Sequence, residues 1–237
     1  MRRVVALCPA LCPVLCLVLC VALLAALATP ARAETVVYEV IEEELVAPGE
    51  STGARFVPAG TAHVPAGIAA FGPFRVLDGK RAALVDVTDE RSPAALSAML
   101  AAFPGIARLE MIECPGTDDD RANLTVGRMI RARGIATHVP DGGSVRSGAV
   151  ELFLAGRTHT AAPGAEFAVH SWLDDDGREP GDFAPDAPEN RAYLDYYREM
   201  GMTEAEARAF YAMTNSVPHH DARWLDAAQM SQWVRLN

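Results

Sequence analysis

Apolar residues divide the chain into an N-terminal apolar run, a Pro/Gly-rich stretch and a long region in which two periodicities alternate. Short apolar runs of strand length occupy residues 82–87, 106–113, 135–139 and 167–172. Helical spacing of apolar residues occurs in 92–103, 118–133, 148–156, 191–200, 204–213 and 227–233. Strands that alternate with helices indicate parallel pairing and right-handed crossovers, so we predict an α/β fold with a mostly parallel sheet and C-terminal helices.

Several helix ends carry recognisable capping residues. Ser92 precedes Pro93 and is expected to cap the first helix. The acidic run 118–120 suits the positive end of the second helix, which Gly134 closes. Thr203 and Glu206 have the spacing of a capping box.

The N-terminal third divides into three parts. Arg2 and Arg3, the apolar run 4–28 and Ala31-Arg32-Ala33 form a secretory signal, with cleavage predicted after Ala33. An uncleaved membrane anchor is the alternative, because the run is about long enough to span a bilayer. Residues 34–73 are predicted to be an extension with an edge strand in 34–46 and a surface loop in 47–73, and residues 74–237 the main domain.

The segment 173–190 is acidic and Pro/Gly-rich, and we expect a loop or lid there.

Export fits the cysteine and charge content. Cys8, Cys12, Cys16 and Cys20 lie on one stripe of the signal segment, where cysteine serves as a small hydrophobe. Beyond it only Cys114 remains, so we expect no internal disulfide and a buried strand position. The 204 residues after Ala33 carry a formal charge of −13, which argues against nucleic acid and an anionic membrane as the main partner. Membrane contact is expected only through an uncleaved N-terminal segment. The alanine- and arginine-rich composition with one lysine is typical of a bacterium with GC-rich DNA, so we expect a periplasmic or secreted bacterial protein.

Candidate chemistry lies at Ser147, where a glycine-bearing loop turns into an apolar helical segment that ends at Gly156. A serine near a helix N-terminus has backbone N–H groups beside it that favour developing negative charge. His170 follows 23 positions later at the end of an apolar run. A histidine that returns beside the serine could take its proton, which is the minimum for nucleophilic acyl transfer.

An ordered set of motifs over residues 81–236 resembles the Clp protease proteolytic-subunit and crotonase superfamily, especially its small exported bacterial members. The motifs are, in order, Cys114-Pro115-Gly116, the helical segment 126–134, the serine segment ending at Gly156, Ala162-Pro163-Gly164-Ala165 before His170, and 223–230. The resemblance implies a spiral of ββα/βαβ units, self-association into a homo-oligomer, and no cofactor or metal.

The resemblance also implies the site. Ser147 would be the nucleophile and His170 the general base of a serine hydrolase acting on a peptide or other acyl substrate. The backbone N–H groups of Gly116 and Gly148 would form the oxyanion hole. Asp221 is the candidate third member of the triad.

Asn215 is an alternative to Asp221, since an amide can also hold an imidazole tautomer. Two residues depart from the family pattern. Thr117 stands where a second glycine is usual, and a β-branched residue resists positive φ. Arg146 precedes the serine and either binds a substrate carboxylate or points to solvent. These departures keep two alternatives open: a catalytically silent binding or scaffold protein, and a thioester-processing crotonase-like enzyme.

Other assignments of the chemistry are weaker. Ser144 has no basic residue at the matching spacing, and Cys114 is expected to lie inside the sheet. Lys80, the single lysine, could form a dyad with Ser147, as some exported relatives use a lysine base. The run 219–221, His-His-Asp, lacks the spacing of a metal site.

Overall fold

The computed structural model describes residues 62–237. The predicted signal sequence in 1–33 and the predicted edge strand in 34–46 lie outside the described residues and stay predictions. Within the described part of the chain, no helix has both the length and the apolar character needed to cross a bilayer.

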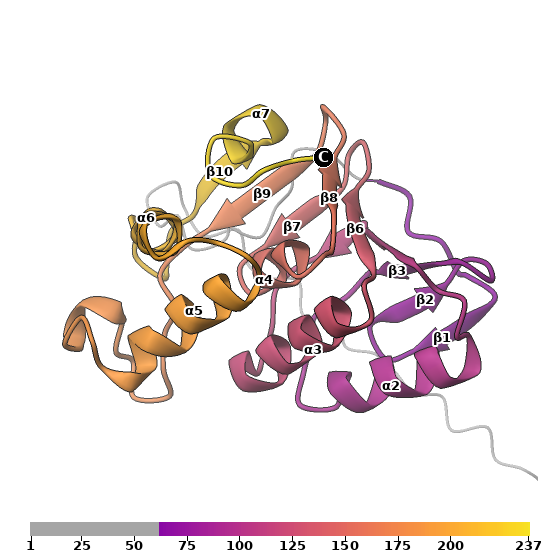
Figure 1. The fold of residues 1–237 in the computed structure, drawn as a ribbon, viewed down its shortest axis with the longest axis horizontal. Helices are drawn as coiled ribbons and strands as arrows, with labels where there is room; N and C mark the ends of the chain where they lie inside the picture. The colour runs from indigo at the N-terminus through magenta and orange to yellow at the C-terminus, as the bar shows by residue number, and fades with distance from the viewer. Residues whose placement is uncertain (1–61) are drawn as a thin grey trace, which may run out of the picture. The chain divides into compact units, whose positions relative to one another are not determined.

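Ten short strands of the described region form two sheets (Figure 1). The first sheet has the order β1 (Ala69–Phe71), β2 (Phe74–Val76), β3 (Arg81–Leu84), β4 (Arg108–Met111), β6 (Ala136–Val139) and β8 (His159–Ala161). The second has the order β10 (Arg223–Asp226), β9 (Glu166–Val169), β7 (Ser144–Arg146) and β5 (Glu113–Cys114). Pairing is parallel from β3 through β4 and β6 to β8, and from β5 through β7 to β9, and antiparallel elsewhere. The predicted α/β fold with a mostly parallel sheet is confirmed.

Successive strands alternate between the two sheets before each helix. The chain runs β4, β5 and helix α3 (Asp120–Ala132), then β6, β7 and α4 (Ala149–Leu154), then β8 and β9. Each turn thus adds one strand to each sheet and one helix, which is a ββα spiral. A further helix, α2 (Ser92–Ala102), follows β3 and packs beside α3 (Figure 1).

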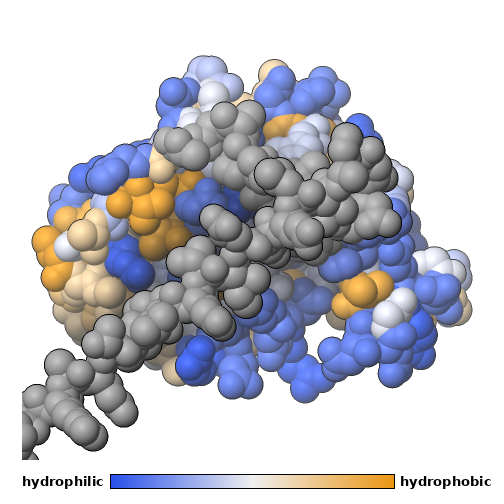
Figure 2. Space-filling model, turned by 180° about the vertical axis from the view of Figure 1, so that it is seen from behind, coloured by the Kyte–Doolittle hydropathy of each residue, from blue (hydrophilic) through white to orange (hydrophobic). Residues whose placement is uncertain are grey.

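The C-terminal part adds helices to this spiral. The segment 173–190, predicted as a loop or lid, contains one 3-10 turn, η2 (Pro180–Asp182), before α5 (Pro188–Glu199) begins. Helix α6 (Glu204–Thr214) packs on α5, and α7 (Ala227–Met230) follows β10. One core joins spiral and C-terminal helices, and its largest fully buried side chains include Tyr196, Tyr197 and Phe153. On the face seen in Figure 2, hydrophilic residues cover most of the visible described surface, in keeping with the charged composition.

The observed helix caps match those predicted from the sequence, with one exception. Asp119 accepts a hydrogen bond from the Ala122 amide at the start of α3, and Gly134 takes a positive φ of 65° after its end. Thr203 and Glu206 form the predicted capping box of α6. Ser92, however, is the first residue of α2 rather than its cap; it is buried, and its hydroxyl bonds Asp89.

Five strands were not predicted from the sequence, namely β1, β2, β7, β8 and β10. β1 lies in the stretch expected to be a surface loop, and its hairpin with β2 turns at Gly72, which has a φ of 53°. β7 and β10 have three and four residues. Such short segments carry too little periodicity to be recognised, and their strand conformation comes from pairing with β9, which lies between them.

Candidate active site

The carboxyl ends of three parallel strands meet at one edge of the second sheet. β7 lies between β5 and β9, with Cys114 opposite Val145 and Arg146 opposite Ala168. Ser147 and His170 come directly after β7 and β9, and Gly116 comes two residues after the end of β5. Because parallel strands end at the same edge, the register brings the three residues together although they are far apart in sequence.

Ser147 occupies a strained position between β7 and α4. Its φ is 50°, and it is the single non-glycine residue of region 62–237 with a positive φ. Its amide donates a 2.9 Å hydrogen bond to the Ala168 carbonyl, and its carbonyl accepts one of 2.9 Å from the Val150 amide. These two bonds hold the backbone in a conformation that costs about 1–3 kcal/mol for a non-glycine residue, which is typical of functional positions.

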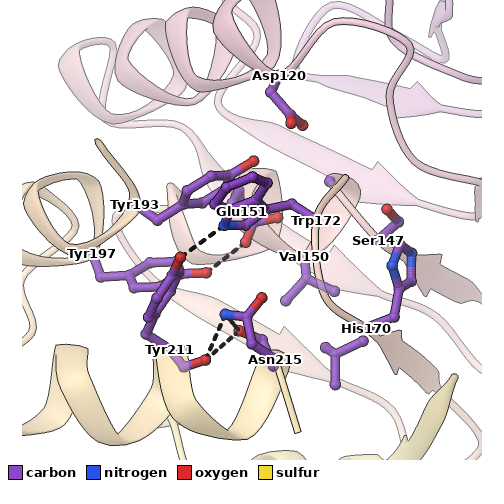
Figure 3. A pocket seen from close by; sticks show the side chains of 13 residues that line it. Asp120, Ser147, Val150, Glu151, His170, Trp172, Tyr193, Tyr197, Tyr211 and Asn215 are labelled. Atoms are coloured by element: carbon purple, nitrogen blue, oxygen red, sulfur yellow. Dashed lines mark hydrogen bonds between the residues drawn. The ribbon is translucent and has the colours of Figure 1, made fainter. Parts of the chain in front are cut away.

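The His170 ring lies beside Ser147 at one end of a pocket that both residues line (Figure 3). The His170 Nδ1 is 2.8 Å from the Ser171 carbonyl oxygen. A carbonyl can only accept, so Nδ1 carries a proton in this contact and Nε2 of the neutral ring is the basic nitrogen. The His219 ring packs edge-on against His170, with centroids 4.8 Å apart, and its Nδ1 is 3.0 Å from the same carbonyl.

Gly116 lies directly against the serine side chain. A Cβ at Gly116 would be 3.0 Å from the Ser147 Cβ and 3.4 Å from its Oγ. The positive φ of this turn, 135°, falls on Gly116 itself, so Thr117 needs no unusual backbone conformation. Thr117 instead stabilises the turn: its hydroxyl donates to the Thr88 carbonyl at 3.1 Å, while the Thr88 amide bonds the Gly116 carbonyl at 3.1 Å. The β-branched residue is therefore accommodated without strain.

Gly148 is the N-cap of α4 and sits in a tight space. A Cβ there would lie 2.5 Å from the Thr117 Cγ2, and the Gly148 carbonyl accepts a 2.5 Å hydrogen bond from the Asn123 amide group. The turn after β5 and the residue after Ser147 are thus packed against each other.

Arg146 neither lines the pocket nor points to solvent, the two positions expected from the sequence. Its side chain is 4% exposed, forms an ion pair with Glu113 and donates to the Ser144 Oγ at 2.7 Å. Both predictions, a substrate-carboxylate ligand and a solvated side chain, are wrong, because Glu113 and Ser144 on adjacent parallel strands supply partners beneath the sheet edge.

Asp221 is not placed at the pocket. It is exposed, its carboxylate accepts from the Ala222 amide at 2.7 Å, and the described lining residues do not include it. Asn215 does line the pocket, and its amide group donates to the Tyr211 carbonyl at 2.7 Å. The His170 tautomer is fixed by the hydrogen bond from its Nδ1–H to the Ser171 carbonyl.

The rest of the pocket is acidic and aromatic, which the sequence analysis missed. Glu151, 6% exposed, lies four residues after Ser147 on α4, and its carboxylate accepts a 2.7 Å hydrogen bond from the Tyr197 hydroxyl. Burial raises the pKa of Glu151 from 4.5 to about 7, the Tyr197 hydrogen bond opposes this, and the nearby charge of Asp120 adds to it. Glu151 lies in the first turn of α4, which begins two residues after Ser147.

The alternative assignments lie elsewhere. Ser144 is fully buried. Cys114 is also fully buried, and burial raises the pKa of its thiol well above the usual value. Lys80 is exposed in the turn before β3, at the opposite end of the strands from Ser147. In region 62–237, no three His, Cys, Asp or Glu side chains are grouped in a way that could hold a metal ion.

Proteins similar to this chain are found among solved structures. No family model and no curated protein matches the chain. Among solved structures, the chain is similar to a ClpP1 mutant from Listeria monocytogenes, with 14% identity over 66% of this chain and 88% of that one and a TM-score of 0.45. It is also similar to the 1510-N membrane-bound stomatin-specific protease in complex with a substrate peptide, with 12% identity over 65% and 72% of the two chains and a TM-score of 0.42.

Proposed function

We propose that the protein is a serine hydrolase of peptidase type, with Ser147 as nucleophile and His170 as general base. The observation that carries the proposal is the strained backbone of Ser147 beside an imidazole, at the edge where three parallel strands end. A packed helix-capping serine has no need of a φ of 50°, whereas a nucleophile that must project from a tight strand-to-helix turn does.

The reaction follows from the groups present. The His170 Nε2 takes the proton of the Ser147 hydroxyl as Oγ bonds to the acyl carbon of the substrate. The carbonyl electron pair moves onto oxygen, where the amides of Gly116 and Gly148 would donate hydrogen bonds. Collapse of the intermediate releases the amine or alcohol, which takes the proton from His170 and leaves an acyl-serine. Water then attacks the ester by the same route in reverse and frees Ser147.

The tautomer of the base is held without a carboxylate in this proposal. The Ser171 carbonyl accepts from the Nδ1–H of His170 at 2.8 Å, so Nε2 is the basic nitrogen of the neutral ring. Asp221 and Asn215 remain candidates for a third catalytic residue, and of the two Asn215 lies at the pocket.

We also propose export to the periplasm or beyond through residues 1–33, self-association of the chain, and a peptide as the acyl substrate. The reaction as written needs no cofactor and no metal. The accommodation of Thr117 and the burial of Arg146 remove the two sequence features that favoured a silent protein.

Labelling with a fluorophosphonate probe tests the proposal. Such a probe phosphonylates an activated serine and needs no knowledge of the substrate. We expect the wild-type protein to be labelled, and Ser147→Ala and His170→Ala to lose labelling. Ser216→Ala is the matched control, because Ser216 is an exposed serine outside the described pocket lining, whose hydroxyl donates to the Met213 carbonyl and accepts from Arg223.

Three results would contradict the assignment. Labelling that persists in Ser147→Ala would place the nucleophile elsewhere. Absence of labelling in well-folded wild-type protein would favour a silent binding protein. Thioester turnover without labelling would favour the crotonase-like alternative, in which the oxyanion hole stabilises an enolate.

A further inference from the structure

The pocket beside Ser147 extends from the reactive end to an acidic end. Ser147 and His170 lie at one end, and Glu151, Tyr197 and Tyr193 at the other (Figure 3). The cavity volume is about 40 Å³, room for about three water molecules or a short unbranched chain. A group attached to an acyl carbon at Ser147 would therefore reach the acidic end.

Two carboxyl groups face this cavity. Glu151 is almost completely buried at its inner end, and Asp120, the first residue of α3, lines it while keeping part of its surface in solvent. None of the described lining residues is lysine or arginine. His170, which the proposed reaction uses, also lines the pocket, and His219, whose ring packs against His170, acts electrostatically on Asp120. A buried carboxylate without a basic partner is costly, and a bound cation would supply the missing charge.

Aromatic rings form the remaining wall. Trp172 and Tyr193 are stacked, with centroids 6.2 Å apart and planes at 6°, and the Tyr193 and Tyr211 rings lie 6.0 Å apart. The Trp172 Nε1 donates to the Tyr211 hydroxyl at 2.7 Å, and that hydroxyl donates to the Asn190 Oδ1 at 2.6 Å. These bonds fix the wall, and aromatic faces attract alkylammonium groups through their ring quadrupoles.

We propose that this cavity is a specificity pocket for a primary ammonium on an unbranched alkyl chain, so that the enzyme cleaves after lysine or ornithine. The cleavage specificity rests on the proposed function. The cation-binding site itself does not depend on it. Glu151 would take the ammonium at the inner end, Asp120 would attract it at the rim, and the rings would cover the alkyl chain. The small volume favours the slender ammonium chain over a branched guanidinium.

Binding of n-butylammonium tests the site without catalysis. The probe and its neutral isostere 1-butanol are titrated by NMR into full-length Ser147→Ala protein at pH 8. We expect the cation to bind about tenfold more tightly than the alcohol, as for a charge-assisted hydrogen bond in a buried site. Adding Glu151→Gln should bring the two affinities within about threefold of each other. Gln retains an acceptor for the Tyr197 hydroxyl, so the fold should tolerate the change.

Two further variants complete the design. Glu189→Gln makes the same chemical change at an exposed position outside the described lining and should leave the tenfold preference intact. Asp120→Asn, at a position partly in solvent, should lower the preference for n-butylammonium over 1-butanol about threefold. This variant tests the site if Glu151→Gln does not fold. Equal affinities for cation and alcohol, or an unchanged preference in Glu151→Gln, would overturn the pocket assignment.

Substrates then separate the two proposals. Fluorogenic peptides with lysine or norleucine before the scissile bond differ only by the ammonium group. Preference for lysine, lost in Glu151→Gln but kept in Glu189→Gln, supports both proposals. Fluorophosphonate labelling of Ser147 with preference for norleucine would overturn the cationic pocket and leave the hydrolase standing. Selective n-butylammonium binding without any labelling would overturn the hydrolase and leave the cation site.

Discussion

Gly116 and Ser147 approach each other so closely that a single added carbon at Gly116 would stand 3.0 Å from the Ser147 Cβ and 3.4 Å from its Oγ. Two strand ends that are neighbours in the parallel sheet produce this contact. One contributes a glycine with a φ of 135°, the other a serine with a φ of 50°. The pair defines the narrow space in which an acyl oxygen would sit.

The first prediction concerns this contact. Gly116→Ala should lower kcat about 10²- to 10³-fold, since the new methyl displaces the serine hydroxyl and the amide beside it. Gly177→Ala is the control, because Gly177 also has a positive φ, 76°, but nothing within 4 Å of the added carbon. Each change should cost about 1–2 kcal/mol of unfolding free energy from backbone strain alone. Rates of fluorophosphonate labelling, measured with urea unfolding, check the difference; equal labelling of the two variants would exclude Gly116 from the site.

The second prediction concerns the strain at Ser147. Both Ser147→Ala and Ser147→Gly remove the hydroxyl, but only glycine adopts a φ of 50° without steric cost. The glycine variant should be about 1 kcal/mol more stable than the alanine variant, after its larger loss of chain entropy. Urea denaturation of the two inactive proteins measures this. A less stable glycine variant would mean that the backbone there is unstrained.

The third prediction is a pH dependence of stability. The pKa of Glu151 is raised from 4.5 to about 7 by burial, so the folded protein holds this proton more tightly than the unfolded chain does. The stability tied to that proton is fully present below pH 4.5 and is lost as the pH rises through 7. Relative to Glu151→Gln, the wild type should lose about 2–3 kcal/mol between pH 5 and pH 8. Parallel stability curves for the two proteins would contradict it.

The fourth prediction extends this to selectivity. A cationic substrate needs the ionised form of Glu151, so the kcat/KM ratio for lysine over norleucine peptides should rise as the pH passes through about 7. His170 acts on both substrates in the same way, so its contribution cancels in the ratio. In Glu151→Gln the ratio should be small and flat. A ratio in the wild type that does not vary between pH 5.5 and pH 8.5 would separate Glu151 from substrate choice.

The fifth prediction assigns a structural role to Arg146. Arg146→Met leaves Glu113 and Ser144 without their shared donor and should cost about 2 kcal/mol, less than for a fully buried pair because Glu113 is 32% exposed. Arg146→Met combined with Glu113→Gln should recover part of this loss. The KM for peptides should not change in the folded enzyme. An increase in KM confined to carboxylate-bearing substrates would restore the substrate-ligand role.

Local pattern was enough for much of the fold. The alternation of short apolar runs with amphipathic stretches predicted parallel pairing, and the capping box at Thr203 and the glycine at position 134 marked helix ends that the structure confirms. These features depend on neighbours within a few residues, so they can be read from the sequence. The three-residue β7 could not, since its conformation comes from strands on either side.

The sequence alone singled out Ser147 and His170 as candidates, through a serine near a helix N-terminus, a histidine 23 positions later and the ordered motifs of residues 81–236. Only the tertiary structure decided what surrounds them. Arg146 pairs with Glu113 and contacts neither a ligand nor solvent, and Asp221 lies outside the pocket. Glu151 lies against aromatic rings from α5 and α6. Such contacts join residues far apart in sequence, 33 positions for Arg146 and Glu113 and 46 for the 2.7 Å bond between Tyr197 and Glu151. Their partners are selected by packing in three dimensions, for which spacing along the chain carries no signal.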